Sequence, residues 1–257
     1  MELARRAVEI LGLGVDIPDE SRMRTTDWIF EQRVMPHLDA VTKHMKRYAG
    51  VSDILNESGS LGDVYWRHGR HNQALEWYGW ALVGQENELG VDHPDTLTTV
   101  NNMASVFSNQ GQYEKALEWY GRVLAGWEKA LGVDHPHTLT TVNNMALVFG
   151  NQGHYEKALE WYGRSLAGRE KALGVDHPDT LTTVHNMASI FDSQGQYEKA
   201  LEWYGRALAG REKVLGVDHP RTQNTIRCLI NLHNKTGRTE EARSLQTRLH
   251  VPNSPSK

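Results

Sequence analysis

"LGVDHPDTLTTVNNMASVFSNQGQYEKALEWYGRVLAGWEKA" runs from Leu89 to Ala130, and nearly the same text follows twice more, from Leu131 and from Leu173. The dipeptide His-Pro recurs every 42 residues, at 93–94, 135–136, 177–178 and 219–220. The hexapeptide ALEWYG recurs at the same interval, starting at 74, 116, 158 and 200. A fixed period of this length is typical of repeat architectures, in which each unit stacks on its neighbours. We therefore predict an array of five units, of which the first and last are degenerate copies.

Each unit has the pattern of two amphipathic helices. The first helix begins at the Pro, which suits the first helical turn, and its apolar residues step by three and four along one face. In the unit quoted above these residues are Leu97, Val100, Met103, Ala104 and Phe107. Gly111 ends this helix, and a second helix from Tyr113 ends before Leu131. Neither helix buries its apolar stripe alone, so stacking of units is expected to form the core.

The residue order within a unit resembles the tetratricopeptide repeat (TPR). The positions that carry the resemblance are Val100, Met103, Ala104, Phe107, Gly111, Tyr113, Ala116 and Tyr120. The 42-residue length, with LGVDHPDTLTTVNNMA in the join, is similar to the kinesin-light-chain type of this repeat. The resemblance implies an all-α, right-handed superhelical solenoid. We expect its five helix pairs at about 49–90, 91–132, 133–174, 175–216 and 217–250.

The segment before the array has a second resemblance. Between Ala7 and Val41, the pieces AVEILG, IPDE, DW and RVMPHLDAV are similar to the stretch that joins the NTPase of NB-ARC or NACHT-type (NLR-like) receptors to such repeats. Residues 1–48 are expected to form a helical linker that caps the first pair, and residues 251–257 a disordered tail. The chain has no G-x-x-x-x-G-K-[ST] motif, so we expect no P-loop binding of ATP by this chain.

Composition excludes several classes of protein. Of the 257 residues 39% are hydrophobic and 23% charged, and the net charge of -4 is not gathered into a basic block, so we expect no nucleic-acid partner. No apolar run is long enough to cross a membrane, and the lone Cys228 fits a reducing compartment. We therefore expect a soluble, cytoplasmic protein without a membrane partner.

The places where the copies differ indicate a binding surface. Across the three best copies ten of the 42 positions vary, and four of the ten fall among the six first-helix positions that face the concave side in the resembled family. Packing residues are fixed by repeat-to-repeat contacts, whereas a binding face is free to change. We expect the groove to be formed by Thr98, Asn101, Asn102, Ser105, Asn109, Thr140, Asn143, Asn144, Leu147, Asn151, Thr182, His185, Asn186, Ser189, Asp192 and Arg227.

Within this set, Asn102, Asn144 and Asn186 repeat without change. An Asn amide both donates and accepts, so a ladder of them is suited to hold the main chain of an extended peptide. The alternative is that these amides bond only within or between helices. The central copies offer no Lys or Arg at groove positions, which argues against a clamp for a C-terminal carboxylate. Arg67 and Arg227, in the end units, remain as anchors for an acidic group.

Other recurring residues favour structural roles. The His of each His-Pro is expected to start a helix and not to bind metal, because neighbouring copies lie about one repeat apart. The Trp of each ALEWYG is expected to pack, whereas Trp80 or Trp127, which break the pattern, are candidates for a contact patch. A second glycine follows the ALEWYG glycine five residues later, and the pair indicates either close helix approach or copying without selection for stability.

No catalytic constellation is present, and we expect neither enzymatic activity nor a cofactor. The predicted function is recognition of a peptide or protein segment in the concave groove, as the sensor region of an NLR-like receptor. Two alternatives stay open. One is a cargo adaptor like kinesin light chain, although residues 1–50 contain no run of three heptads. The other is a scaffold that forms homo-oligomers through its outer, Trp-bearing face.

Overall fold

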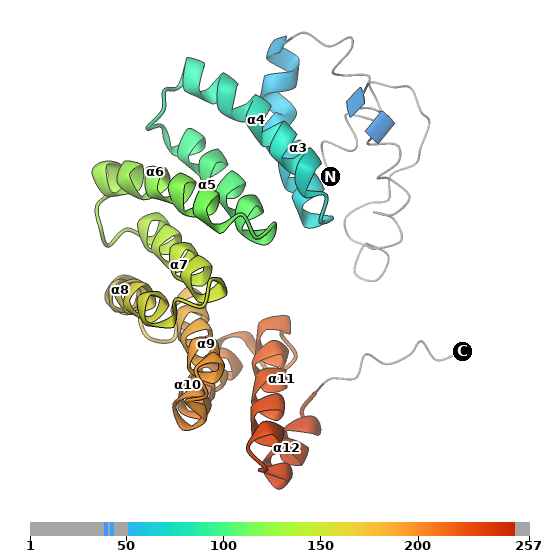
Figure 1. Ribbon diagram of the computed structural model, residues 1–257, viewed down its shortest axis with the longest axis vertical. Coiled ribbons are helices and arrows are strands. Elements are labelled where there is room, and N and C mark those ends of the chain that lie inside the picture. Colours follow the sequence, from blue (N-terminus) through green and yellow to red (C-terminus); the bar gives the residue numbers. More distant parts are fainter. Residues whose placement is uncertain (1–38, 41, 44–50, 250–257) are drawn as a thin grey trace. The chain divides into compact units, whose positions relative to one another are not determined.

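The computed structural model describes residues 39, 40, 42, 43 and 51–249. These residues contain ten helices, and no strand occurs over 51–249 (Figure 1). The prediction of an all-α solenoid of helical repeats is therefore confirmed. The predicted cap at 1–48, apart from the four residues named above, and the predicted tail at 251–257 lie outside the described residues.

The helices follow one another as five pairs. They are α3 (Val51–Arg67) with α4 (His71–Glu88), α5 (Pro94–Asn109) with α6 (Tyr113–Leu131), α7 (Pro136–Asn151) with α8 (Tyr155–Leu173), α9 (Pro178–Ser193) with α10 (Tyr197–Leu215), and α11 (Pro220–Lys235) with α12 (Thr239–Gln246). The chain divides into two compact units, unit 1 up to Val106 and unit 2 from Phe107 onwards. The two units are described separately below.

Histidine starts the first helix of each pair in unit 2. His135, His177 and His219 have extended backbones, and a Pro follows each of them in the first turn. The Nδ1 atom of each accepts a hydrogen bond from the N–H two residues later, at 3.2, 3.1 and 3.1 Å. In unit 1, His93 accepts from the Asp95 N–H in the same way. The predicted helix-start role is confirmed, since each ring satisfies an N–H that the first turn leaves without a partner.

Glycine closes the second helix and sets the path to the next pair. Gly132 and Gly174 have φ of 91° and 94°, a region that favours glycine, and their N–H groups donate to the carbonyls of Glu128 and Glu170. The glycine carbonyl then accepts the hydroxyl of a buried Thr in the following helix. For Gly174 this donor is Thr180, at 2.8 Å. Each join is thus held from both sides, which fixes the spacing of successive pairs.

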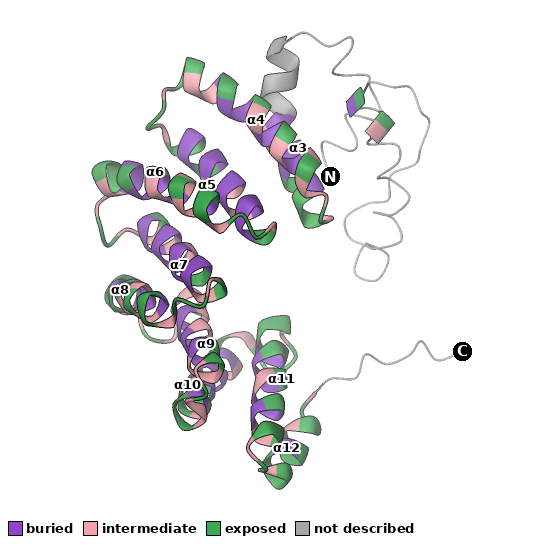
Figure 2. Cartoon of the chain, viewed as in Figure 1, coloured by how far each residue is buried: buried purple, intermediate pink, exposed green. Residues whose placement is uncertain are grey.

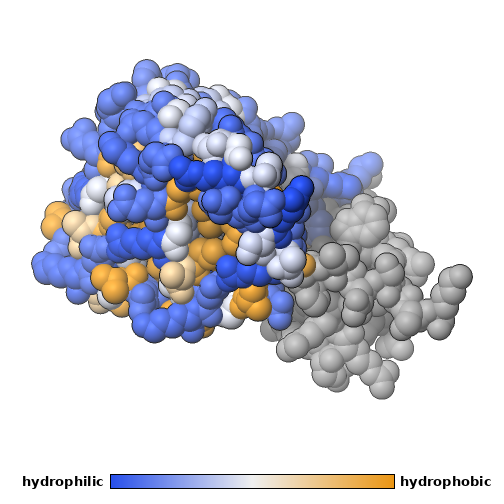
Figure 3. Space-filling model, turned by 90° about the horizontal axis from the view of Figure 1, so that it is seen from below, coloured by the Kyte–Doolittle hydropathy of each residue, from blue (hydrophilic) through white to orange (hydrophobic). Residues whose placement is uncertain are grey.

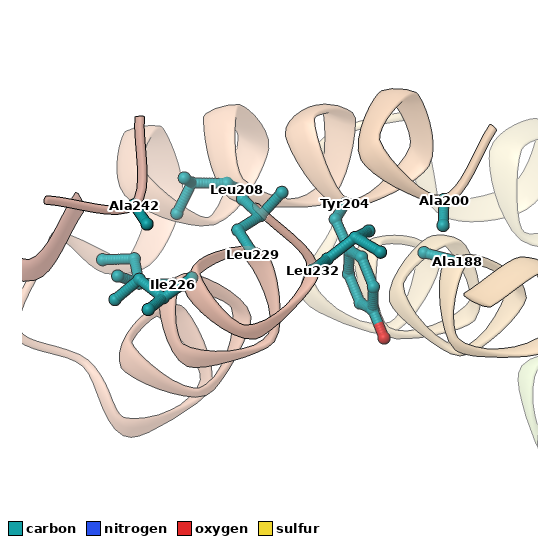
Figure 4. Packing of buried hydrophobic residues seen from close by; sticks show 9 residues of the cluster. Ala188, Ala200, Tyr204, Leu208, Ile226, Leu229, Leu232 and Ala242 are labelled. Carbon is teal, nitrogen blue, oxygen red and sulfur yellow. The ribbon is translucent and has the colours of Figure 1, made fainter. Parts of the chain in front are cut away.

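Apolar side chains fill the space between successive helices of unit 2. Each of the helices α7 to α11 packs against the next, and α7 also contacts α9, the next first helix. Buried residues line the facing sides of these helices (Figure 2). In the C-terminal part, Ala188 and Ala200 allow α9 and α10 to approach closely, and Tyr204, Leu208 and Ile226 continue the same core (Figure 4).

The tryptophans divide into packed and exposed residues. In unit 2 the ring centroids of Trp161 and Trp203 lie 5.9 Å from those of Phe149 and Phe191, which confirms the predicted packing role. Trp127 is also buried, at 4% exposure, and its ring stacks on His137. The suggestion that Trp127 marks a contact patch is therefore wrong, because the indole fills the space between α6 and α7. In unit 1, Trp80 is 39% exposed.

The two recurring glycines of the second helices differ in their surroundings. A Cβ added to Gly168 would lie 2.6 Å from a methyl group of Leu139, and one added to Gly210 would lie 2.5 Å from Leu181. Apart from its chain neighbours and the backbone of its own helix, no described atom lies within 4 Å of a Cβ added to Gly163 or Gly205. Close helix approach thus accounts for the glycine before the join, whereas no contact requires the glycine of ALEWYG.

This difference gives a stability prediction. Gly163→Ala and Gly205→Ala should each raise the free energy of unfolding by about 0.5–1 kcal/mol, because alanine loses less backbone entropy in a helix interior. Gly168→Ala, in the same helix as Gly163, should instead lower it by about 1–3 kcal/mol through overpacking against Leu139. Urea unfolding of the three variants measures both effects. Stabilisation by Gly168→Ala would contradict the close-contact account.

Some large apolar side chains of the described residues are exposed at the surface. Figure 3 shows apolar patches separated by hydrophilic side chains on the face that it presents. Val175, Val214 and Val217 belong to the exposed apolar residues of unit 2. Within the described part of the chain, every helix is too short or too polar to cross a bilayer.

Candidate functional site: the face of the first helices

The sequence-predicted groove residues occupy the first helices, but their accessibility differs. Thr98, Asn109, Leu147, Asn151, Ser189 and Arg227 are exposed. Half-buried positions are held by Asn101, Asn102, Ser105, Thr140, Asn144, Thr182, His185, Asn186 and Asp192. Asn143 is buried, at 7% exposure. The predicted set therefore contains a solvent-facing row and a row that lies between neighbouring repeats.

The buried row joins one repeat to the next. The Thr183 hydroxyl lies 3.2 Å from the Asn143 Oδ1 and donates to it. At the same place one repeat later, His185 Nδ1 lies 3.3 Å from the Thr225 hydroxyl. These side chains hold α7 to α9 and α9 to α11. Asn143 is consequently not accessible to a ligand in this arrangement, a position that the sequence pattern did not distinguish from its exposed neighbours.

The repeated Asn residues lie beside buried tyrosines of the preceding second helix. In unit 1, the Asn102 amide donates to Asp63 Oδ1 at 3.3 Å, and the Tyr78 hydroxyl donates to the same oxygen at 2.5 Å. In unit 2, the Asn186 amide faces the Tyr162 hydroxyl, and burial raises the pKa of that tyrosine. The Tyr162 hydroxyl has no hydrogen bond of good geometry to any described residue. Asn102 is thus held by Asp63 in unit 1, whereas Asn186 in unit 2 is half-buried beside Tyr162.

Cys228 takes the place of this Asn in the last pair. It is half-buried beside Tyr204, and burial raises the pKa of its thiol. A raised pKa keeps the sulfur protonated, which makes it a poor nucleophile. This agrees with its interpretation as a small apolar side chain and not as a reactive thiol.

The exposed row carries several of the positions that change between copies. Leu147, 43% exposed, stands where Ser189 stands one repeat later. The next residues inward, Ala146 and Ala188, are fully buried and identical. Between α7 and α9 the exposed residues Leu147 and Asn151 are replaced by Ser189 and Ser193. On the packed side Asn143 is replaced by His185, which also lies near the Thr of the next repeat, and Val148 by the similarly apolar Ile190.

Two buried arginines lie under this face, and sequence reasoning missed them. Arg169 and Arg211 belong to the second helices α8 and α10, and they are 4% and 3% exposed. Arg169 Nη1 donates to the Asp179 carbonyl at 2.8 Å and to the Thr183 hydroxyl at 3.0 Å. Its Nη2 donates to the Thr140 hydroxyl at 2.9 Å. One guanidinium thus ties its own first helix, α7, to the first helix of the next repeat, α9.

Arg211 repeats the arrangement with weaker electrostatic support. Its donors reach the Arg221 carbonyl, the Thr225 hydroxyl and the Thr182 hydroxyl at 3.0, 2.6 and 3.4 Å. Burial, with the nearby charge of Arg221, lowers its pKa to about 10. Among the described residues no carboxylate hydrogen-bonds to either guanidinium. The charge of Arg211 also helps burial to lower the pKa of His185 to about 4, so His185 is neutral at pH 7.

Within unit 2, the cations on the exposed row lie in α11, and in unit 1 the predicted anchor Arg67 is exposed. Arg227 is exposed, and Lys235 forms an ion pair of 2.9 Å with Asp192. Lys235, the last residue of α11, was missed by the sequence reasoning. In the described residues no group of three or more His, Cys, Asp or Glu side chains is placed to hold a metal ion.

Comparison with known proteins now gives the family. The tetratricopeptide repeat family model matches residues 52–128, 95–171 and 140–213, which together span more than half of the chain. The chain belongs to the tetratricopeptide repeat family. The TPR fold is a non-catalytic scaffold that generally serves protein–protein interaction. No curated protein matches the chain.

Solved structures agree with the family. A Podosopora anserina protein described as a kinesin light chain with nearly identical TPR-like repeats is 25% identical, with a TM-score of 0.61. The match covers 79% of this chain and 95% of that one. BtubC from P. vanneervenii (19% identity, TM-score 0.65, 100% of this chain and 94% of that one) shows the same fold. So does NprR, solved in complex with its cognate peptide NprX (20%, 0.64, 95% and 70%). The predicted kinesin-light-chain-like TPR fold is confirmed.

Proposed function

We propose that the face of the first helices binds an extended segment of a partner protein. The observation that carries this proposal is the division within unit 2 between a row whose side chains bond neighbouring repeats and an exposed row whose side chains change from copy to copy. Hydrogen bonds among Asn143, Arg169 and Thr183 hold neighbouring repeats together. Leu147 and Ser189 take no part in these bonds, so contacts between repeats do not explain why the two residues differ. Variation at exposed sites on a rigid scaffold is typical of a recognition surface.

The half-buried amides supply the main-chain contacts. Asn144 and Asn186 lie one repeat apart in equivalent positions, and each retains donor and acceptor groups for a peptide bond. The exposed residues beside them then provide selectivity between partners. NprR, a protein of the same fold, was solved in complex with a peptide, which supports a peptide segment as the ligand.

The test compares matched faces of the same helix pairs. Peptides that bind the wild-type chain are selected from a random display library. Their affinity is then measured for the wild type and for one variant that combines Asn102→Ala, Asn144→Ala and Asn186→Ala. We expect at least a tenfold loss of affinity, about 1.4 kcal/mol. The control combines Glu160→Ala and Glu202→Ala, exposed residues of α8 and α10. Equal binding by the groove variant, with an unchanged circular-dichroism melting curve, would count against the proposal.

We further propose that this recognition is the sensing step of an NLR-like receptor of the cytoplasm. Support comes from the resemblance of residues 7–41 to the stretch that precedes repeats in such receptors, although these residues lie outside the described part of the chain apart from 39 and 40. Reading the coding sequence upstream of Met1 tests the idea. An NTPase in frame supports it, and an unrelated gene with its own stop codon contradicts it.

A cargo adaptor is the second candidate, because a relative described as a kinesin light chain is 25% identical. The homo-oligomeric scaffold receives less support. In unit 2, Trp161 and Trp203 are half-buried, and the guanidinium groups of Arg164 and Arg206 lie 6.0 and 5.7 Å from their ring centroids. Light scattering at two concentrations should therefore give the monomer mass; a rise to the dimer mass would favour the scaffold.

A further inference from the structure

Unit 1 contains a cavity of about 260 Å³ on the side of its first helices, between α3, α4 and α5. Its lining includes Gly59, Asp63, Gln85, Asp95 and Thr99. A volume just below the range of small-molecule pockets matches one long side chain better than a drug-sized ligand.

The repeat period identifies what fills the same place in unit 2. Gln85 lies two periods before Arg169 and three before Arg211. Likewise Asp95 and Thr99 correspond to Asp179 and Thr183, whose carbonyl and hydroxyl accept from Arg169 Nη1. The cavity in unit 1 thus coincides with the site that the chain's own guanidinium groups occupy in unit 2.

A second truncation enlarges this space. Gly59 stands at the position of Asn143 and His185, the side chains that reach the Thr of the next repeat in unit 2. In unit 2 the Thr183 hydroxyl contacts the Arg169 guanidinium and the Asn143 amide. Neither group has a counterpart at Thr99, because Gln85 and Gly59 stand at the two positions. The first repeat therefore keeps two of the acceptors of the site, the carbonyl of Asp95 and the hydroxyl of Thr99, and lacks the donor.

The polar groups left in the cavity favour a cation. The Gln85 Oε1 atom is buried and finds no hydrogen-bond partner among the described residues. Asp63, at a position where the next three copies have Ser or Leu, adds a carboxylate, and the Asp95 carboxylate lies at the exposed mouth. Several acceptors around a narrow space suit the five donors of a planar guanidinium better than a lysine ammonium.

We propose that this cavity receives an arginine side chain of the partner segment, which takes the place that Arg169 and Arg211 fill in the later repeats. The inference rests on the proposed function, because Thr98 and Asn102 of the predicted groove also line the cavity. The inference specifies one residue of the partner segment, an arginine, and places that residue at the first repeat.

The test uses a probe that needs no partner protein. Isotope-labelled full-length chain is titrated with N-acetyl-arginine methylamide up to about 50 mM, since one side chain is expected to bind at millimolar concentration. The side-chain amides of Gln85 and Asn102 should shift in the NMR spectrum. The lysine and citrulline analogues should bind at least tenfold more weakly, because the first lacks the planar fork and the second lacks the charge.

Two variants locate the response. Gln85→Arg restores the side chain of the later repeats, so it should fold, fill the cavity and abolish the shift of the Asn102 amide. Asp63→Asn should keep the fold and weaken binding at least threefold by removing one carboxylate. Absence of shifts in the wild type, equal shifts with citrulline, or shifts that persist in Gln85→Arg would overturn the inference. Failure of this titration, with groove-dependent capture of selected peptides intact, would remove the arginine site and leave the proposed function standing.

Discussion

Arg169→Ala should lower the free energy of unfolding by about 3 kcal/mol. The substitution removes three hydrogen bonds donated by a buried charged group, to the Asp179 carbonyl and to the Thr183 and Thr140 hydroxyls. It also leaves a void between α7, α8 and α9, because the side chain is 4% exposed. Urea unfolding followed by circular dichroism measures the change.

A matched control lies five residues earlier in the same helix. Arg164 forms an ion pair with Glu128, with side chains 38% and 33% exposed. Solvent-exposed pairs contribute little, so Arg164→Ala should cost less than about 1 kcal/mol. Equal losses for the two variants would show that Arg169 does not join the repeats as described.

His185 should make stability depend on pH between about 6.5 and 4. Burial and the charge of Arg211 lower its pKa from 6.5 to about 4 in the folded chain. Below pH 6.5 the unfolded chain therefore binds a proton that the folded chain does not, so stability falls as the pH falls. At pH 5 the loss amounts to about 2 kcal/mol, and it stops growing below pH 4.

The repeats supply the control for this prediction. The equivalent residue one repeat earlier is Asn143, which accepts a hydrogen bond from the Thr183 hydroxyl. His185→Asn therefore introduces a residue that this position already holds in another copy. The variant should fold and should lose about 2 kcal/mol less than the wild type between pH 7 and pH 5. Urea unfolding at the two pH values gives the comparison. Parallel losses in both proteins would exclude His185 as the source.

The period of the sequence made most of the fold predictable. Repetition at 42 residues, Pro after His135 and its copies, and Gly132 at a join predict helix pairs and their order, because capping and turn chemistry are local. The side chain of His135 then forms the N-cap that the pattern indicates.

The site was less predictable because long side chains carry their polar groups away from their own helix. Arg169 reads in the sequence as one charge of an exposed REK stretch, whereas its guanidinium reaches the hydroxyl of Thr140 on the first helix. The long side chain of Trp127 likewise reaches the next helix, where its ring stacks on His137 and is buried. An alignment of the copies shows that Gln85 stands where two later copies have Arg. The cavity beside Gln85 becomes visible only when the positions of α3 and α5 are known.

Site-specific cross-linking tests the central claim most directly, that the exposed row of the first helices contacts the bound segment. A photoreactive amino acid is placed at Leu147 or Ser189, and in matched samples at Ala167 or Ala209, which are exposed on the second helices of the same pairs. With a selected peptide bound, the account predicts cross-links from positions 147 and 189 and none above background from 167 and 209. Cross-links that form mainly from 167 and 209 would contradict it.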